Sequence, residues 1–156
     1  MTPEIKLILW IFLTVDFLVL IGLGVSSVLK AVRRRQILHF GDKAEEEVSE
    51  ALQNEFPGAV VLNNVYLKSG RGTTQLDHIL ICKWGLFVIE TKSHNGRIQI
   101  EKKEWTQFYK DKIVRFRSPI LQNESHVRAL EQILKRHRAL QRIKVQGLVV
   151  FTSKKV

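Results

Sequence analysis

The chain has little of several residues whose abundance would define a protein class. Its 156 residues include one cysteine, three prolines and nine glycines. The single cysteine, Cys82, excludes a disulfide framework and any site built on a Cys-x-x-Cys pair, and it fits a reducing compartment. So few prolines and glycines exclude collagen-like and linker-like chains. With 45% hydrophobic and 26% charged residues, the composition is that of one folded globular domain.

Acidic residues are the other scarce group. There are 15 Asp and Glu against 25 Lys and Arg, which gives a net charge of +10 and an isoelectric point near 10. Residues 1–35 hold five of the basic and two of the acidic residues, so 20 basic and 13 acidic residues remain in 36–156. The excess of +7 in that part indicates a polyanionic partner, either nucleic acid or anionic lipid.

A long apolar run lies near the N-terminus. Leu7 to Leu29 is 23 residues with one charge, Asp16, and such a helix spans roughly 34 Å, enough to cross a bilayer. Basic residues gather after the run. The positive-inside rule therefore predicts a single-pass anchor in 1–35 at the cell membrane, with the N-terminus outside and 36–156 in the cytoplasm. A cleaved signal peptide is the alternative, but the run is long for a signal core and no A-x-A site follows it. Asp16 is either a tolerated lone acid or a polar contact within the membrane.

Periodicity and turn residues predict a mixed α/β order for the rest of the chain. The expected elements are a helix at 41–54, strands at 59–67, 75–82 and 85–92, a less regular β region at 97–117, a helix after Pro119 and a strand at 145–151. Asp42 is the expected N-cap of the first helix, and the two glycines in 68–73 predict a turn. The strands at 75–82 and 85–92 are apolar on both faces, as in a sheet covered on both sides. This order predicts helices packed around one sheet.

Three polar residues of the two central strands suit catalysis. Glu90 and Lys92 are two residues apart and share one face, and Asp77 lies on the preceding strand. A loop at 83–84 would place Asp77 opposite Glu90, whereas a loop at 84–85 would place it opposite Lys92. Either register brings two carboxylates and a lysine together, and paired carboxylates need a compensating charge. A divalent cation supplies it, which suits phosphodiester hydrolysis, although an ordinary ion pair between Lys92 and one acid is the alternative.

Several stretches from Phe40 to Phe151 follow one another in an informative order. They are G-D-K-A-E-E-E-V-S-E-A-L at 41–52, T-Q-L-D-H-I-L-I at 74–81, G-L-F-V-I-E-T-K at 85–92 and S-P-I-L-Q-N-E-S-H at 118–126, together with Asn95-Gly96 and Trp105. In order and spacing they resemble the nuclease-related domain (NERD) family, a branch of the PD-(D/E)xK nuclease superfamily. The resemblance implies a restriction-endonuclease-like α/β core of α-β-β-β-α-β order, with a mixed four-stranded sheet flanked by helices, and it makes 36–156 the nuclease-related domain.

The resemblance also implies roles for individual residues. Asp77 and Glu90 match the acids that bind Mg²⁺ or Mn²⁺, and Lys92 matches the catalytic lysine. Glu45 corresponds to a helix glutamate that completes such sites, although its spacing from an N-cap at position 42 also fits a capping box. Gln122 matches a site glutamine, or it bonds local backbone.

Three neighbouring residues have other interpretations. Thr91 stands where the family more often has an aliphatic residue, and alternation points it away from the acids. His78 is expected to be a hydrogen-bonded core histidine on that same opposite face. His126 lies one helical turn after Gln122 and faces either the site or the solvent.

The β region at 97–117 interleaves basic and aromatic residues, which suits phosphate contact and base stacking. Its candidate nucleic-acid-binding residues are Lys102, Lys103, Lys110, Lys112, Arg115 and Arg117. A half-buried hairpin with a solvated outer face is the alternative.

The hypothesis is therefore a membrane-tethered, divalent-metal-dependent nuclease that hydrolyses DNA, or RNA, on the cytoplasmic side. The alternative is an inactive nucleic-acid-binding or scaffold module at the membrane. The expected partners are nucleic acid and the lipid bilayer, without a small-molecule cofactor. A homodimer is also implied, because many nucleases of the superfamily cut duplex DNA as dimers.

Overall fold

A computed structural model describes residues 23–32, 41–70 and 72–152 of the chain. It divides into two compact units between Phe40 and Gly41. In the first unit the described residues 23–32 are helical, and most of the predicted membrane segment, 7–22, lies outside the described residues. Within the described part of the chain, no helix has the length and hydropathy needed to span a bilayer.

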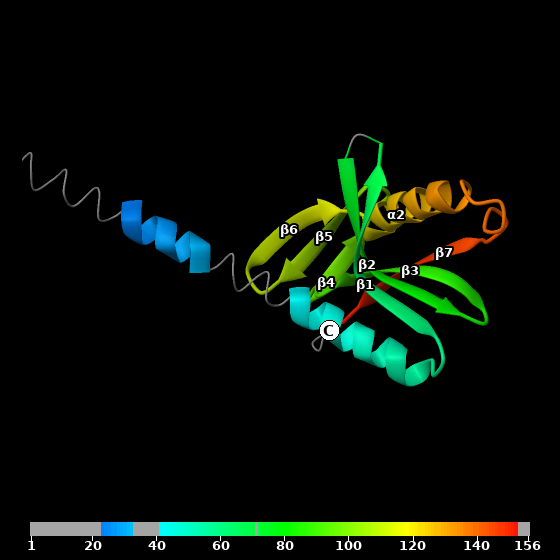
Figure 1. Cartoon of the computed structure of the whole chain (residues 1–156). Coiled ribbons are helices and arrows are strands. Elements are labelled where there is room, and N and C mark those ends of the chain that lie inside the picture. The colour runs from blue at the N-terminus through cyan, green and yellow to red at the C-terminus, as the bar shows by residue number, and fades with distance from the viewer. Residues whose placement is uncertain (1–22, 33–40, 71, 153–156) are drawn as a thin grey trace, which may run out of the picture. The chain divides into compact units, whose positions relative to one another are not determined.

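The second unit is built on a four-stranded sheet with the order β1-β2-β3-β7 (Figure 1). Its strands are β1 (Val60–Ser69), β2 (Gly72–Cys82), β3 (Gly85–Lys92) and β7 (Val145–Phe151). β2 pairs antiparallel with both β1 and β3, and β7 runs parallel to β3. The predicted mixed sheet is confirmed, and it fits a restriction-endonuclease-like core. The turn expected over 68–73 is shorter, because both strands continue into it and pair as far as Ser69 and Gly72.

A helix covers each face of this sheet. The helix over 41–55 buries Val48 against Leu80 and Ile89 on one face. On the other face α2 (Pro119–Leu134) packs Leu130 against the cluster that contains Val88. The two layers confirm the predicted helix positions. Asp42 is not the N-cap expected for it, because Gly41 is already helical.

The start of α2 follows from its sequence. Proline occupies the first turn, where its missing N–H leaves no backbone acceptor unpaired. The hydroxyl of Ser118, the N-cap, accepts a hydrogen bond from the Leu121 N–H at 3.4 Å. The end of β6 therefore leads directly into a capped helix, and Gln122 falls in the first turn of that helix.

The β region at 97–117 forms a second sheet of three antiparallel strands. These are β4 (Arg97–Ile100), β5 (Glu104–Tyr109) and β6 (Lys112–Arg117), with the order β4-β5-β6. A turn at Lys110-Asp111 joins β5 to β6, and Lys110 has a positive φ of 51°. Trp105 is buried and its ring stacks on Phe151 at 6.0 Å between centroids, which attaches this sheet to the end of β7.

The β2–β3 register selects one of the two predicted hairpins. Cys82 pairs with Gly85, so Lys83-Trp84 is the loop, and pairing continues to His78 opposite Ile89. On the other side of β2, the β1–β2 ladder skips the position of Asn64 and Asp77, and Asn64 has a positive φ of 53°.

At this skipped position β1 and β2 twist, so that residues which alternation would place on one face of the sheet lie on the other. Before it, Val61 and Leu80 pack under the helix over 41–55. Beyond it, Val65 and Leu76 pack with the cluster under α2, although simple alternation would keep them on the first face. Asp77 therefore lies at this twist, and the alternation of its neighbours does not predict the direction of its side chain.

Candidate active site

The candidate site centres on Glu90, which is 1% exposed near the end of β3. Its Oε1 accepts hydrogen bonds from Lys92 Nζ at 2.5 Å and from Gln122 Nε2 at 2.6 Å. Its Oε2 lies 3.3 Å from His126 Nε2, but the two atoms are not aligned for a hydrogen bond. One strand residue and two helix residues therefore meet at the buried carboxylate of Glu90, because α2 presents positions 122 and 126 one turn apart.

Burial and neighbouring charges give the carboxylates different proton affinities. Burial alone would raise the pKa of Glu90, but the contacts with His126 and Lys92 outweigh it and hold that pKa below its ordinary value. Burial raises the pKa of Asp77, and the charge of Glu90 adds to this effect, although the Thr91 N–H and Lys92 oppose it. An ionised acid beside an acid that resists ionisation is a pattern common in sites of acid–base chemistry.

Asp77 is held by backbone rather than by a side-chain partner. The Thr91 N–H donates to its Oδ2 at 2.9 Å, across the gap where the β2–β3 ladder has ended. The acid is thereby fixed beside the strand that carries Glu90 and Lys92. The structure brings these three residues together as predicted from their spacing.

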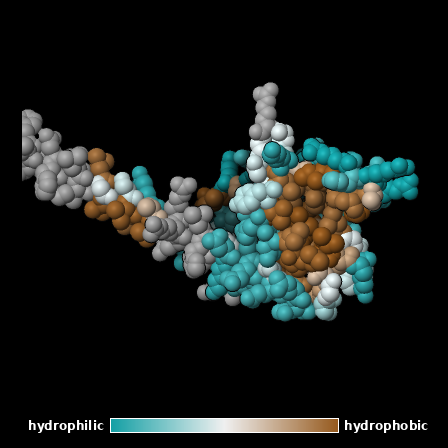
Figure 2. All heavy atoms as spheres, viewed as in Figure 1, coloured by the Kyte–Doolittle hydropathy of each residue, from teal (hydrophilic) through white to brown (hydrophobic). Residues whose placement is uncertain are grey.

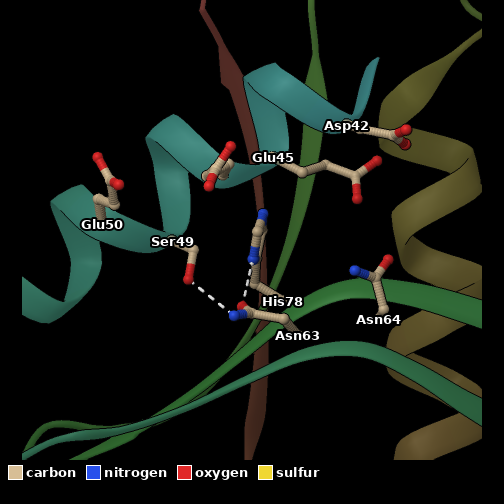
Figure 3. A pocket seen from close by; sticks show the side chains of 8 residues that line it. Asp42, Glu45, Ser49, Glu50, Asn63, Asn64 and His78 are labelled. Carbon is tan, nitrogen blue, oxygen red and sulfur yellow. Dashed lines mark hydrogen bonds between the residues drawn. The ribbon is translucent and has the colours of Figure 1, made fainter. Parts of the chain in front are cut away.

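Glu45, on the helix over 41–55, interacts electrostatically with Asp77, Glu90 and Lys92. It lines a pocket of about 460 Å³ with Asn63, Asn64 and His78, and Figure 3 shows its side chain extending from the helix toward the strand that carries Asn64. Burial raises its pKa to about 7, and the negative charge of Asp77 is the next cause. A carboxyl group with that pKa exchanges its proton readily at neutral pH.

Behind the acids, buried polar side chains form a chain of hydrogen bonds on the opposite face. Asn63 Nδ2 donates to Ser49 Oγ at 2.7 Å, and Asn63 Oδ1 lies 2.8 Å from His78 Nδ1. His78 Nε2 lies 3.1 Å from the Thr91 hydroxyl (Figure 3 shows the first two of these bonds). The prediction that His78 is a hydrogen-bonded core residue is confirmed.

This network assigns the His78 tautomer. The side-chain nitrogen of Asn63 donates to Ser49, so the side-chain oxygen of Asn63 faces His78. Because that oxygen can only accept, His78 Nδ1 must carry the hydrogen. Burial lowers the pKa of His78, which keeps the ring neutral, so Nε2 accepts a hydrogen bond from the Thr91 hydroxyl. The threonine that departs from the family pattern thus has a partner.

The donors and acceptors test whether a divalent cation fits. Within residues 23–32, 41–70 and 72–152, no three His, Cys, Asp or Glu side chains converge as a metal site by themselves. Mg²⁺ commonly takes only one or two protein carboxylates, with water and substrate phosphate completing its shell. Lys92 and Gln122 both donate to Oε1 of Glu90, which leaves the buried Oε2 without a hydrogen bond. A site of two carboxylates, Asp77 and Glu90, is therefore compatible with Mg²⁺.

The second sheet separates the six basic residues predicted to bind nucleic acid. Arg115 and Arg117 pair with Thr106 and Glu104, so they share one face, whereas Lys112 pairs with Tyr109 on the other. Lys102 and Lys103 lie in the β4–β5 turn, and Lys110 lies at the opposite end of β5. One surface therefore does not contain all six.

Sequence reasoning missed one basic residue of this sheet and left another site residue open. Arg97 pairs with Phe108, which places it on the face of Arg115, and its guanidinium lies 4.7 Å from the Phe108 ring. Alternation across three strands would have found it once the register was known. His126 is buried against Glu90, and its spacing from Gln122 was the available signal.

The sequence profile of the nuclease-related domain matches residues 40–152. The chain belongs to the nuclease-related domain family. This family is part of the PD-(D/E)xK nuclease-like superfamily. The chain is also 33% identical over 120 residues to an uncharacterised protein of Bacillus anthracis, a match that covers 74% of this chain and 57% of that protein. No solved structure matches the chain.

Proposed function

We propose that this NERD protein is a divalent-metal-dependent nuclease that hydrolyses phosphodiester bonds in nucleic acid, with DNA as the expected substrate. Family membership supports a nuclease-like function at a coarse level. The observation that carries the finer proposal is the meeting of Asp77, Glu90 and Lys92 at the end of β3. Charge couples Asp77 to both of its partners there.

Each residue of the site has a chemical role in this proposal. Asp77 and Glu90 would hold Mg²⁺ or Mn²⁺, which supplies charge stabilisation for the scissile phosphate. Lys92 places a positive charge beside the same phosphate. Gln122 and His126 orient Glu90, and Glu45, whose pKa is about 7, is suited to accept a proton from the attacking water.

Substrate contact is assigned to one face of the second sheet. Arg97, Arg115 and Arg117 lie there together with Phe108. Arginines bind phosphates, and a guanidinium on an aromatic ring offers a flat surface on which a base can stack. The opposite face of this sheet adjoins the site, since His94, two residues after Lys92, packs on Phe116 of β6 at 4.2 Å between ring centroids, and Phe116 pairs with the buried Trp105.

The location in the proposal is the inner face of the cell membrane, with 7–29 as the tether. Its support is the apolar run and the basic residues that follow it in the sequence. Eight residues, 33–40, separate the helical residues 23–32 from the helix over 41–55 in the sequence, and eight residues reach at most about 26–29 Å even when fully extended. The nuclease would therefore act on nucleic acid close to the bilayer.

Purified full-length protein in mild detergent tests the activity. Plasmid, linear duplex, single-stranded DNA and RNA are incubated with Mg²⁺, Mn²⁺ or EDTA, using the wild type, Glu90→Gln and Asp77→Asn. Glu124→Gln is the matched control, because it neutralises a half-exposed acid on α2 that pairs only with Arg128 among the described residues. Metal-dependent cleavage that both site variants lose and the control keeps is the expected result. Cleavage that persists in Glu90→Gln would refute the assigned site.

A binding module without catalysis is the second candidate. It is favoured by the number of protein groups already around Glu90, namely Lys92, Gln122 and His126. It predicts salt-dependent DNA binding by a folded wild type that neither Mg²⁺ nor Glu90→Gln changes, with no cleavage in either metal.

A further inference from the structure

The end of the four-stranded sheet opposite the candidate site has a surface of its own. At this end the β2–β3 loop, Lys83-Trp84, lies beside the segment 135–144, because Gly85 and Leu86 begin β3 where Val145 begins β7. The first pair of β1 and β2, Val60 with Ile81, lies at the same end. We call these parts together the turn end.

Large apolar side chains are exposed across the turn end. Trp84 is 61% exposed, Val60 52% and Ile81 43%, and in the segment 135–144 Leu140 and Ile143 are also exposed. Figure 2 shows apolar side chains gathered in a broad patch on the second unit. Patches of this kind commonly mark an interaction with another molecule or with a membrane.

Positive charge accompanies these apolar side chains. The segment 135–144 reads K-R-H-R-A-L-Q-R-I-K, with five Lys and Arg and no acid, and every one of its residues is exposed. Its backbone is ordered by turns, since Leu140 N and Ile143 N donate to His137 O and Leu140 O. In the neighbouring loop the Lys83 ammonium lies 4.4 Å from the centre of the Trp84 ring.

We propose that the turn end docks on an anionic lipid surface. Basic side chains attract acidic headgroups, and the aliphatic side chains and Trp84 between them enter the boundary with the acyl chains. Tryptophan is enriched at that depth of a bilayer. Nucleic acid fits this end less well, because the five basic residues of 135–144 are interspersed with the aliphatic Leu140 and Ile143, whereas Arg97 and Arg115 share a face with Phe108 on the second sheet. A second copy fits less well too, because two such ends would bring like charges together.

Docking in this way leaves the candidate site open. Lys92, at the site, lies six positions after Leu86, at the turn end, which along β3 is roughly 20 Å at about 3.3 Å per residue. The docking surface does not depend on the proposed tether, although a tether would raise its concentration near the bilayer. The site would therefore face nucleic acid while the opposite end of the sheet binds lipid.

The test uses the full-length chain with a fluorescent label at a single cysteine, in a Cys82→Ala background. The label is placed at Leu140→Cys, or at Gln99→Cys on β4 as the control, which is exposed on the second sheet. Each protein is reconstituted in vesicles of phosphatidylcholine alone or of phosphatidylcholine with about 30% of the anionic lipid phosphatidylglycerol, whose negative surface potential attracts basic segments. Emission wavelength and quenching by aqueous iodide are measured, and circular dichroism checks the fold.

We expect anionic vesicles to shift the emission at position 140 to shorter wavelength and to reduce its iodide quenching several-fold, with no change at position 99. A variant with Arg136, Arg138, Arg142 and Lys144 replaced by glutamine should lose the difference between the two vesicles. Equal quenching at position 140 in both vesicles overturns the proposal. Reduced iodide quenching at position 140 in detergent also overturns the proposal. If it appears on raising the protein concentration, the occupant is a second copy, and if it appears on adding an oligonucleotide, the occupant is nucleic acid. Incorporation of the protein into vesicles of phosphatidylcholine alone tests the proposed tether separately, because these vesicles carry no net negative charge for the turn end to bind.

Discussion

Replacing Thr91 by valine tests the buried network behind the acids. Valine has nearly the shape of threonine but lacks the hydroxyl that donates to His78 Nε2. His78 is 1% exposed, so its ring nitrogen would have no water to replace this donor. A buried acceptor left without a partner costs about 1–3 kcal/mol, which is a large share of the ~5–15 kcal/mol that stabilises an ordinary domain.

Urea unfolding of the full-length chain in mild detergent measures this cost through tryptophan emission. Trp105 is the useful reporter, because it is 3% exposed and stacks on Phe151. Thr91→Val should lower the free energy of unfolding by about 1–3 kcal/mol. Thr91→Ser is the matched control, since it keeps the hydroxyl and loses only a methyl group, at roughly 0.5–1 kcal/mol.

The tautomer gives a second, independent measurement. Nitrogen-15 NMR of the His78 ring should show a hydrogen on Nδ1 and none on Nε2 in the wild type. Thr91→Val keeps the backbone N–H that bonds Asp77. The cleavage activity of this variant should therefore fall only in proportion to the fraction of protein that is unfolded. A free-energy change below about 0.5 kcal/mol, within the range of ordinary surface substitutions, or a hydrogen on Nε2, would refute the reasoning.

Three further predictions follow from single positions. Because the pKa of Glu45 is raised to about 7 in the folded state, that state binds the extra proton between pH 4.5 and 7. Glu45 therefore contributes a loss of stability as pH rises through this window, and Glu45→Gln should reduce the difference between the unfolding free energies measured by urea titration at pH 5 and pH 8. Gly96 has a φ of +84° and a Cβ there would clash with the Phe108 carbonyl oxygen, so Gly96→Ala should lower the unfolding free energy by roughly 1–3 kcal/mol in the same assay. Arg115→Ser should reduce the slope of log DNA affinity against log salt by about one in fluorescence anisotropy, while Lys112→Ser, on the opposite face, should change it less.

Local sequence pattern predicted most of the sheet. Gly85–Lys92 and Val145–Phe151 have the expected bounds, because continuous β-branched and apolar runs ended by turn residues are a strong local signal. Of the two hairpin loops considered from the sequence, the structure has the one at Lys83-Trp84. Which loop forms depends on pairing along the whole ladder, and this lies beyond a local pattern.

The polar surroundings of the site were less predictable. Asn64 adopts a left-handed backbone, and the twist of β1 and β2 there moves Leu76 to the face under α2. Simple alternation cannot anticipate such a twist, because it arises from packing on both faces of the sheet at once. Whether His126 faces the site or the solvent could not be predicted for a similar reason. The rotation of α2 about its axis decides what this side chain contacts.

The candidate site lies where backbone pairing gives way to side-chain pairing. The β2–β3 ladder is continuous from the Lys83-Trp84 loop to His78 and then stops. Beyond it, two bonds of Thr91 join the strands: its hydroxyl bonds the buried His78, and its backbone N–H bonds the Asp77 carboxylate. The side chain of a residue within the ladder points to one face or the other as the pleat dictates. A carboxylate beyond the ladder is free of this constraint, so these bonds can direct it at a ligand. The turn end keeps its full ladder, so the rigid end of the sheet is available for docking while the site end presents its acids.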